Sequence, residues 1–155
     1  MKNTKGFTLV EVLVTMVIMA IGLLGLAGLQ GASLKNNQSA YYRSQATQLA
    51  YDLADRMRAN VAEASKGSTS TYITKTPSTA VTKTGCTAVS GTCTPAQMAE
   101  NDLAEWYSDL DNIFPGNLIS IGFAAPIFTI SINWDDNRDS NIDNNDPNFQ
   151  MSFQL

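Results

Sequence analysis

The chain of 155 residues contains no histidine. Histidine is the commonest general base and a common metal ligand, and it is the side chain that titrates near neutral pH. Its absence excludes a Ser-His or Cys-His nucleophile pair within this sequence. No other catalytic constellation stands out, so we expect a protein that is not an enzyme.

The sequence also has few cysteines and a small net charge. The two cysteines, Cys86 and Cys93, favour a disulfide if the chain is exported, and two sulfurs without histidine fall short of a zinc site. The net charge of -4 gives no reason to expect binding to a nucleic acid backbone.

No proline precedes Pro77, and a long apolar run takes up the start of the chain. Residues 1–6 are polar, and their only charges are Lys2 and Lys5. Residues 7–29 are almost continuously apolar, long enough to span the roughly 30 Å hydrocarbon layer as a helix. The two lysines predict a cytoplasmic N-terminus. The run is too long for an ordinary secretory signal peptide.

Glu11 lies near the start of this apolar run. A charged carboxylate costs about 2.5–3.5 kcal/mol at the centre of a spanning helix and less near its end. Such residues usually have a function and a partner. Position alone leaves two interpretations open: a functional carboxylate, or a hydrated one at the level of the lipid headgroups.

The motif GFTLVE at residues 6–11 follows a short leader with lysines and precedes an apolar helix. It resembles the class III signal of type IV prepilins. Other segments are similar to minor pilins of the PilV type, the pilus modification proteins. They are residues 20–30 (AIGLLGLAGLQ), residues 49–60 (LAYDLADRMRAN), Trp106, residues 114–116 (FPG) and Trp134-Asp135.

This resemblance implies roles for three residues. Gly6 would precede the bond that the prepilin peptidase cleaves, Phe7 would become the N-methylated first residue, and Glu11 would serve subunit assembly. Cleavage before Phe7 creates an amino group in the membrane, and Glu11 of a neighbouring subunit can neutralise it. The two charges are each costly in lipid, and their pairing sets the axial register of one helix against the next.

Helical patterning continues beyond the membrane segment, which predicts one helix from Phe7 to Ala64. An apolar face recurs at spacings of three and four: Tyr42, Ala46, Leu49, Leu53, Met57 and Val61. Opposite charges at helical spacing, Asp52 with Arg56 and Asp55 with Arg58, mark the polar side. We expect a leader at 1–6, a transmembrane and assembly half at 7–30, an amphipathic half at 31–64 and an extracytoplasmic head at 65–155.

The first part of the expected head, residues 65–95, is rich in Ser, Thr, Lys and Gly and predicts an exposed, irregular connection. A helix is then predicted to start at Thr94, with Pro95 in its first turn and Gln97 three residues after the cap. Pro115-Gly116 ends it. Its apolar face comprises Ala99, Leu103, Trp106, Tyr107 and Leu110.

Three segments with alternating apolar residues follow, at 119–123, 128–134 and 149–155. This period of two predicts an antiparallel sheet of about three strands with one apolar face. The amphipathic part of the long helix can cover that face. The pattern therefore predicts an α+β fold, which is also the type IV pilin fold that the resemblance implies.

The segment between the last two strands holds alternating oxygen donors at Asp139, Asn141, Asp143 and Asn145. Such donors suit calcium, and some pseudopilins carry calcium in loops of this kind. The glycine and glutamate of an EF-hand loop are missing. The other interpretation is a turn built from Asp and Asn, so we expect no firm cofactor.

The leading functional hypothesis is a minor pilin of the type IV pilus, acting in pilus assembly or initiation and in motility or adhesion. Expected partners are other minor and major pilins, the prepilin peptidase and the inner-membrane assembly platform. The chain would cross the inner membrane once with a periplasmic head, and then reach the pilus. The alternatives are a minor pseudopilin of a type II secretion system and a membrane-tethered, extracytoplasmic binding module.

Overall fold

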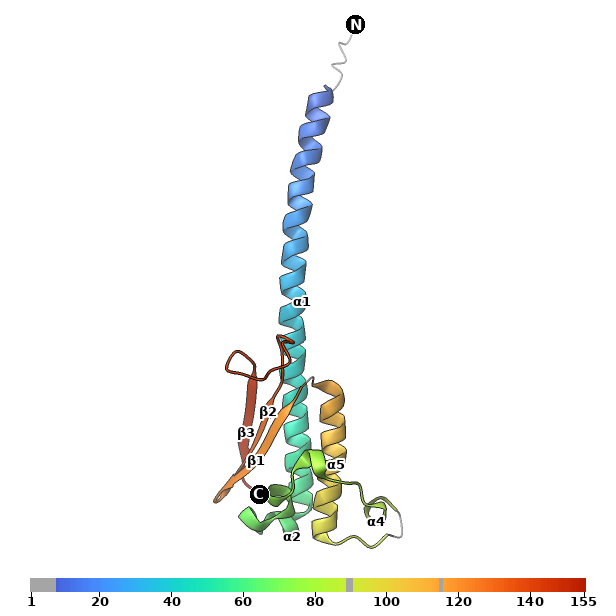
Figure 1. Ribbon diagram of the computed structural model, residues 1–155, viewed down its shortest axis with the longest axis vertical. Coiled ribbons are helices and arrows are strands. Elements are labelled where there is room, and N and C mark those ends of the chain that lie inside the picture. Colours follow the sequence, from blue (N-terminus) through green and yellow to red (C-terminus); the bar gives the residue numbers. More distant parts are fainter. Residues whose placement is uncertain (1–7, 89–90, 115) are drawn as a thin grey trace. The chain divides into compact units, whose positions relative to one another are not determined.

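The computed structural model describes residues 8–88, 91–114 and 116–155. The predicted processing residues Gly6 and Phe7 lie outside the described residues, as does Pro115 of the predicted helix end. The chain forms two compact units, residues 1–40 and residues 41–155. Helix α1 (Leu9–Ala59) contributes to both units (Figure 1).

Helix α1 ends at Ala59, and a separate short helix, α2 (Val61–Ala64), follows. The predicted continuous helix to Ala64 is therefore wrong. Asn60 leaves the helical region, with φ -108° and ψ 50°, and its side-chain amide donates to the carbonyl of Pro95 at 2.8 Å. The predicted place of Val61 in the apolar face is also wrong, because its side chain is 56% exposed.

Within the second unit, α1 contributes one buried face. Four of the predicted residues are buried, namely Ala46, Leu49, Leu53 and Met57. Tyr42 is partly buried against the same core. The predicted ion pairs of Arg56 with Asp52 and of Arg58 with Asp55 are both present at 2.9 Å.

The predicted irregular connection is better ordered than its composition suggested. It contains four short helical turns: η1 (Gly67–Thr69), α3 (Thr71–Thr74), η2 (Pro77–Thr79) and α4 (Thr84–Thr87). Tyr72 of α3 is fully buried in the core, and its hydroxyl donates to Asp102. The prediction of an exposed, irregular connection is therefore wrong for the middle of this segment, which Tyr72 fixes to the core.

Helix α5 (Pro95–Ile113) begins with the predicted capping box. The Thr94 hydroxyl accepts from the Gln97 N–H at 3.3 Å, and the Gln97 side chain accepts from the Thr94 N–H at 3.0 Å. Of its predicted apolar face, four residues are buried and Tyr107 stays partly exposed. Trp106 also donates its indole N–H to the carbonyl of Leu49 at 2.8 Å, which ties α5 to α1.

The predicted antiparallel sheet is confirmed. Its strands β1 (Leu118–Ala124), β2 (Ile127–Asn133) and β3 (Asn148–Phe153) lie in the order β1-β2-β3. The register places apolar residues opposite one another in three rows: Ile119-Ile132-Phe149, Ile121-Ile130-Met151 and Phe123-Phe128-Phe153. This apolar face and the buried faces of α1 and α5 form one core, which confirms the α+β class.

The buried carboxylate of Glu63 joins α2 to the start of α3. Its side chain is 2% exposed and accepts from the N–H and hydroxyl of Thr71 at 2.8 and 2.9 Å. Lys66 forms an ion pair with it. Burial raises the pKa of Glu63, but the hydrogen bonds from Lys66 and Thr71 outweigh burial, so the pKa lies below its ordinary value.

Glu63→Gln is expected to destabilise the protein by about 1–3 kcal/mol at pH 7, because charge-assisted hydrogen bonds are lost. The pKa of Glu63 is lower in the folded protein than in the unfolded chain, where it is about 4.3. The charged carboxylate therefore stabilises the fold above about pH 4.3, and this stabilisation is lost as the pH falls through the pKa of the folded state. The difference from wild type should therefore shrink below about pH 4.3. Urea midpoints of wild type and Glu63→Gln at pH 7 and pH 3 measure this difference. Asp109→Asn is the control, because Asp109 is exposed. An equal difference at both pH values would contradict this prediction.

Candidate functional site

Thr8 and Glu11 form a reciprocal pair at the start of α1. The Thr8 N–H and hydroxyl donate to Oε2 of Glu11 at 3.0 and 3.2 Å. In return, the Glu11 N–H donates to the carbonyl and hydroxyl oxygens of Thr8 at 3.1 and 3.4 Å. This arrangement is a capping box, with Thr8 as the cap and Glu11 three residues later.

The two side-chain contacts of Glu11 both use Oε2. Among the described residues, no donor contacts the other carboxylate oxygen, Oε1. Glu11 is thus held in one orientation by its own helix and retains an acceptor for a group outside the described residues. The Thr-x-x-Glu spacing at residues 8–11 is a cap signal that is visible in the sequence and independent of the charge of Glu11.

Thr8→Ala should loosen the first turn of α1, because loss of a cap hydroxyl costs about 1 kcal/mol. Amide hydrogen exchange at residues 11–14 should then accelerate about fivefold in detergent micelles. Thr15→Ala is the matched control: Thr15 donates its hydroxyl to the Val12 carbonyl at 2.8 Å and caps nothing. Equal exchange in both variants would show that the Thr8 hydroxyl does not cap the helix.

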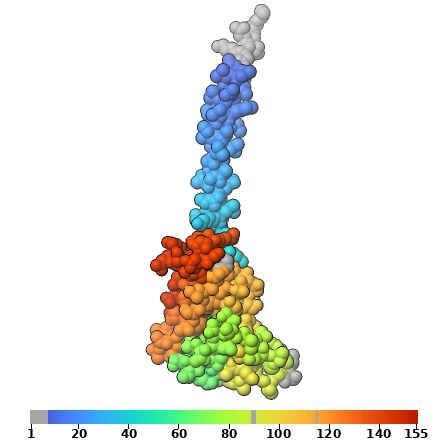
Figure 2. Space-filling model, viewed as in Figure 1, coloured from blue at the N-terminus to red at the C-terminus, as the bar shows by residue number. Residues whose placement is uncertain are grey.

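The helix around Glu11 exposes large apolar side chains throughout the first unit. Figure 2 shows one face of this part of the helix in blue. Leu9 is 80% exposed, Leu24 is 73% exposed and Leu34 is 70% exposed. By length and composition, α1 can cross a membrane, and its most apolar stretch has no buried residue. Apolar surface of this extent needs lipid or other helices to cover it.

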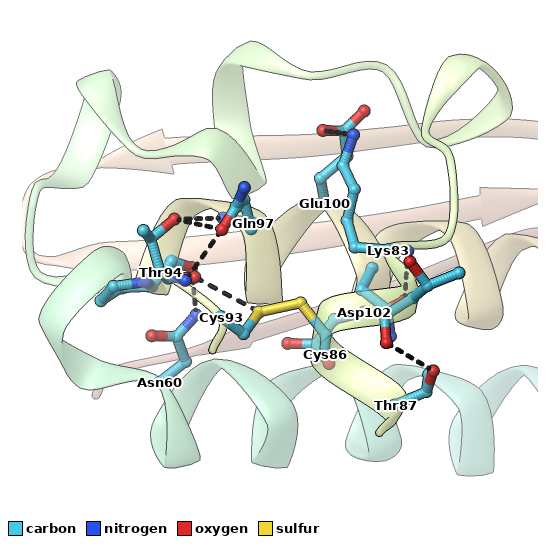
Figure 3. Close-up of a disulfide and its surroundings, with 12 residues drawn as sticks. Asn60, Lys83, Cys86, Thr87, Cys93, Thr94, Gln97, Glu100 and Asp102 are labelled. Carbon is cyan, nitrogen blue, oxygen red and sulfur yellow. Dashed lines mark hydrogen bonds and ion pairs between the residues drawn. A yellow bond between two sulfur atoms is a disulfide. The ribbon is translucent and has the colours of Figure 1, made fainter. Parts of the chain in front are cut away.

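The predicted disulfide between Cys86 and Cys93 is present, with Cα atoms 5.0 Å apart (Figure 3). It links α4 to the residue that precedes the cap of α5. Inside the closed loop, a Cβ on Gly91 would overlap the carbonyl oxygen of Gly85, so the backbone approach requires glycine there. The cysteines therefore act as a local cross-link beside the helix start.

A charged cluster joins the helices of the second unit. Arg56 of α1 contacts Asp52 and Glu105 at 2.9 Å and Asp102 at 3.6 Å. Burial raises the pKa of Asp102, and the hydrogen bond from Tyr72 and the charge of Arg56 offset this only in part. The charged and polar groups of this cluster are thus partners of one another across α1, α3 and α5, so we interpret the cluster as structural.

The candidate calcium residues form backbone turns. Asp139 accepts from the Asn141 N–H at 2.9 Å, and Asp143 accepts from the Asn145 N–H at 2.7 Å. In the parts of the chain that the structure describes, no group of three or more His, Cys, Asp or Glu side chains is placed to hold a metal ion. The loop thus matches the interpretation as an Asp- and Asn-rich turn.

Two family models match the chain, and their ranges adjoin. The prokaryotic N-terminal methylation motif matches residues 1–27, which include the GFTLVE segment. The Tt1218-like model, described as type IV pilin Tt1218, matches residues 28–104. No curated protein and no solved structure matches the chain. The matched models do not distinguish the PilV branch or separate minor from major subunits.

Proposed function

Because this chain is a type IV pilin-like protein, we propose that it is a minor pilin that takes part in assembly or initiation of the type IV pilus. The observation that carries this proposal is Glu11, oriented by Thr8 in the exposed apolar part of α1 inside the matched methylation motif. The segments at residues 20–30 and 49–60 support the minor class, because they are similar to PilV-type minor pilins.

In this proposal the prepilin peptidase removes residues 1–6 and Phe7 is methylated. Subunits then associate through residues 7–30, and Oε1 of Glu11 pairs with the amino group of Phe7 on a neighbouring subunit. Each charge alone is costly in lipid, and a pair with good geometry offsets part of that cost. The capping box favours this step because the carboxylate is already oriented before assembly.

The N-terminal methylation motif and the long apolar stretch of α1 indicate an inner-membrane anchor. We further propose that Lys2 and Lys5 keep the N-terminus cytoplasmic and that the head from residue 65 onward is periplasmic before it reaches the pilus. The disulfide between Cys86 and Cys93 supports this placement, since structural disulfides persist in oxidising compartments. The amphipathic half, residues 31–64, would connect anchor and head.

An in-frame deletion tests this proposal, with pilus counts by electron microscopy, twitching assays and an assay of type II secretion in the same strain. We expect fewer pili and reduced twitching, with unchanged secretion and recovery on complementation. Lost secretion with normal pili would assign the chain to the pseudopilins instead. Normal pili, twitching and secretion would reject a role in assembly.

A further inference from the structure

Strand β3 forms one outer edge of the sheet (Figure 1). β2 is the one described strand paired with it, through a continuous register from Asn133-Asn148 to Phe128-Phe153. The sequence of β3, NFQMSF, has no charged residue and no proline, and its pairing contains no bulge. Charged residues, prolines and bulges are the features that proteins use to block pairing at sheet edges, and β3 has none of them. The outer backbone groups of β3 are therefore open to another strand.

The opposite edge strand differs in its surroundings. Elements η1 and α3 pack against β1, and Thr76, Pro77 and Ser78 lie beside Leu118 and Ile119 at its start. β3 has extensive contacts with β2 alone among the described elements. The sheet thus has one flanked edge and one free edge.

The two ends of the free edge differ in their surroundings. The loop before β3, residues 135–147, contains five aspartates and one arginine. Asp135 is buried, and residues 137–141 are exposed at the surface (Figure 2, red). At the other end, the guanidinium of Arg58 lies 5.3 Å from the ring centroid of Phe153. A strand running antiparallel to β3 would place its C-terminal end beside the acidic loop.

The direction of β3 argues against pairing between two copies. Trp134, beside the start of β3, contacts Tyr42, whereas Phe153 at its end contacts Arg58. β3 therefore runs in the same direction as the Tyr42–Arg58 part of α1. Two copies packed with these helical parts parallel would present parallel β3 strands, so antiparallel pairing of β3 with β3 is excluded in that arrangement.

We propose that the β3 edge binds an extended segment of another protein by β-strand addition. The segment consists of about six uncharged residues with alternating apolar side chains, followed by lysine or arginine. Backbone hydrogen bonds to β3 supply affinity. The apolar side chains of the segment extend the three cross-strand rows that end in Phe149, Met151 and Phe153. The basic end of the segment lies beside the acidic loop, residues 135–147. This proposal does not depend on Glu11 or on pilus assembly.

The probe is a fluorescent peptide, IFTISINKK, which carries the sequence of β2 followed by two lysines. β2 is already complementary to β3, and its C-terminal residue Asn133 pairs with Asn148 beside the acidic loop. Binding to the full chain in detergent micelles is measured by fluorescence anisotropy. A peptide ending in two glutamates tests the charge requirement.

The matched variants are Ser152→Lys on β3 and Ser120→Lys on β1, since both serines are exposed on the polar face of the sheet. We expect saturable binding of the probe, at least tenfold weaker binding to Ser152→Lys, and unchanged binding to Ser120→Lys. The glutamate peptide should bind at least threefold more weakly than the probe. No binding to wild type, or equal losses in the two variants, would overturn the site, and equal binding of both peptides would overturn the basic partner.

Discussion

Glu11→Ala is expected to reduce incorporation of the protein into filaments by tenfold or more, up to roughly 100-fold. In the proposed assembly, the amino group of Phe7 on the neighbouring subunit would then have no partner in an apolar environment. An unpaired charge costs about 2.5–3.5 kcal/mol at the centre of a spanning helix and less near its end. Each 1.4 kcal/mol corresponds to a factor of ten, so a loss of about 100-fold is the upper limit. Quantitative immunoblots of sheared pili and of whole cells measure the incorporated fraction.

Membrane insertion of the Glu11→Ala variant should be unchanged, because the substitution makes the helix more apolar. The control is Asp55→Ala, which removes an exposed carboxylate from the same helix within the second unit. Wild-type incorporation of Glu11→Ala would contradict the assembly role and favour a tethered module that never polymerises.

Glu11→Gln separates the two roles of this side chain. The amide oxygen of glutamine can still accept from the Thr8 N–H and hydroxyl, so the cap at the start of α1 is kept. The negative charge is lost. A defect as large as that of Glu11→Ala would assign the effect to charge, whereas near-normal incorporation would assign it to the cap.

Trp106→Ala is expected to cost about 3–5 kcal/mol of folding stability. The side chain is fully buried in the core, and its indole N–H donates to the carbonyl of Leu49 at 2.8 Å. The substitution removes both the packing and the link between α5 and α1. The urea midpoint should fall by about 1 M or more.

Trp134 reports this unfolding in the full chain, because it is the second of two tryptophans and remains in the variant. Tyr51→Ala provides the control: this aromatic side chain on α1 is 56% exposed and should tolerate truncation. A midpoint for Trp106→Ala within error of the Tyr51→Ala midpoint would show that α5 is not fixed to α1 as described.

The predictions that succeeded rest on local patterns. Three runs of period two specified the strands and their apolar face, because a half-buried sheet requires alternation along each strand. The Thr94-Pro95-x-Gln97 motif specified the start of α5 for a similar reason, since cap hydrogen bonds join residues three apart. These signals need no knowledge of the tertiary structure.

The predictions that failed depend on contacts between distant residues. Tyr72 is a single aromatic ring in a segment whose Ser and Thr content is typical of exposed loops. It is buried by the packing of α3 against α5 and other distant elements, which include β1. Asn60 ends α1 through a bond to Pro95, thirty-five residues away. A helical pattern that continues to Val61 contains no local signal for that break.

The most direct test of the central claim is the intact mass of the protein from cells with and without the prepilin peptidase. Entry into the pilin pathway predicts loss of Met1–Gly6 and gain of one methyl group, only when the peptidase is present. The same unprocessed mass in both strains would contradict the proposed processing at Gly6 and Phe7, and with it assembly through Glu11.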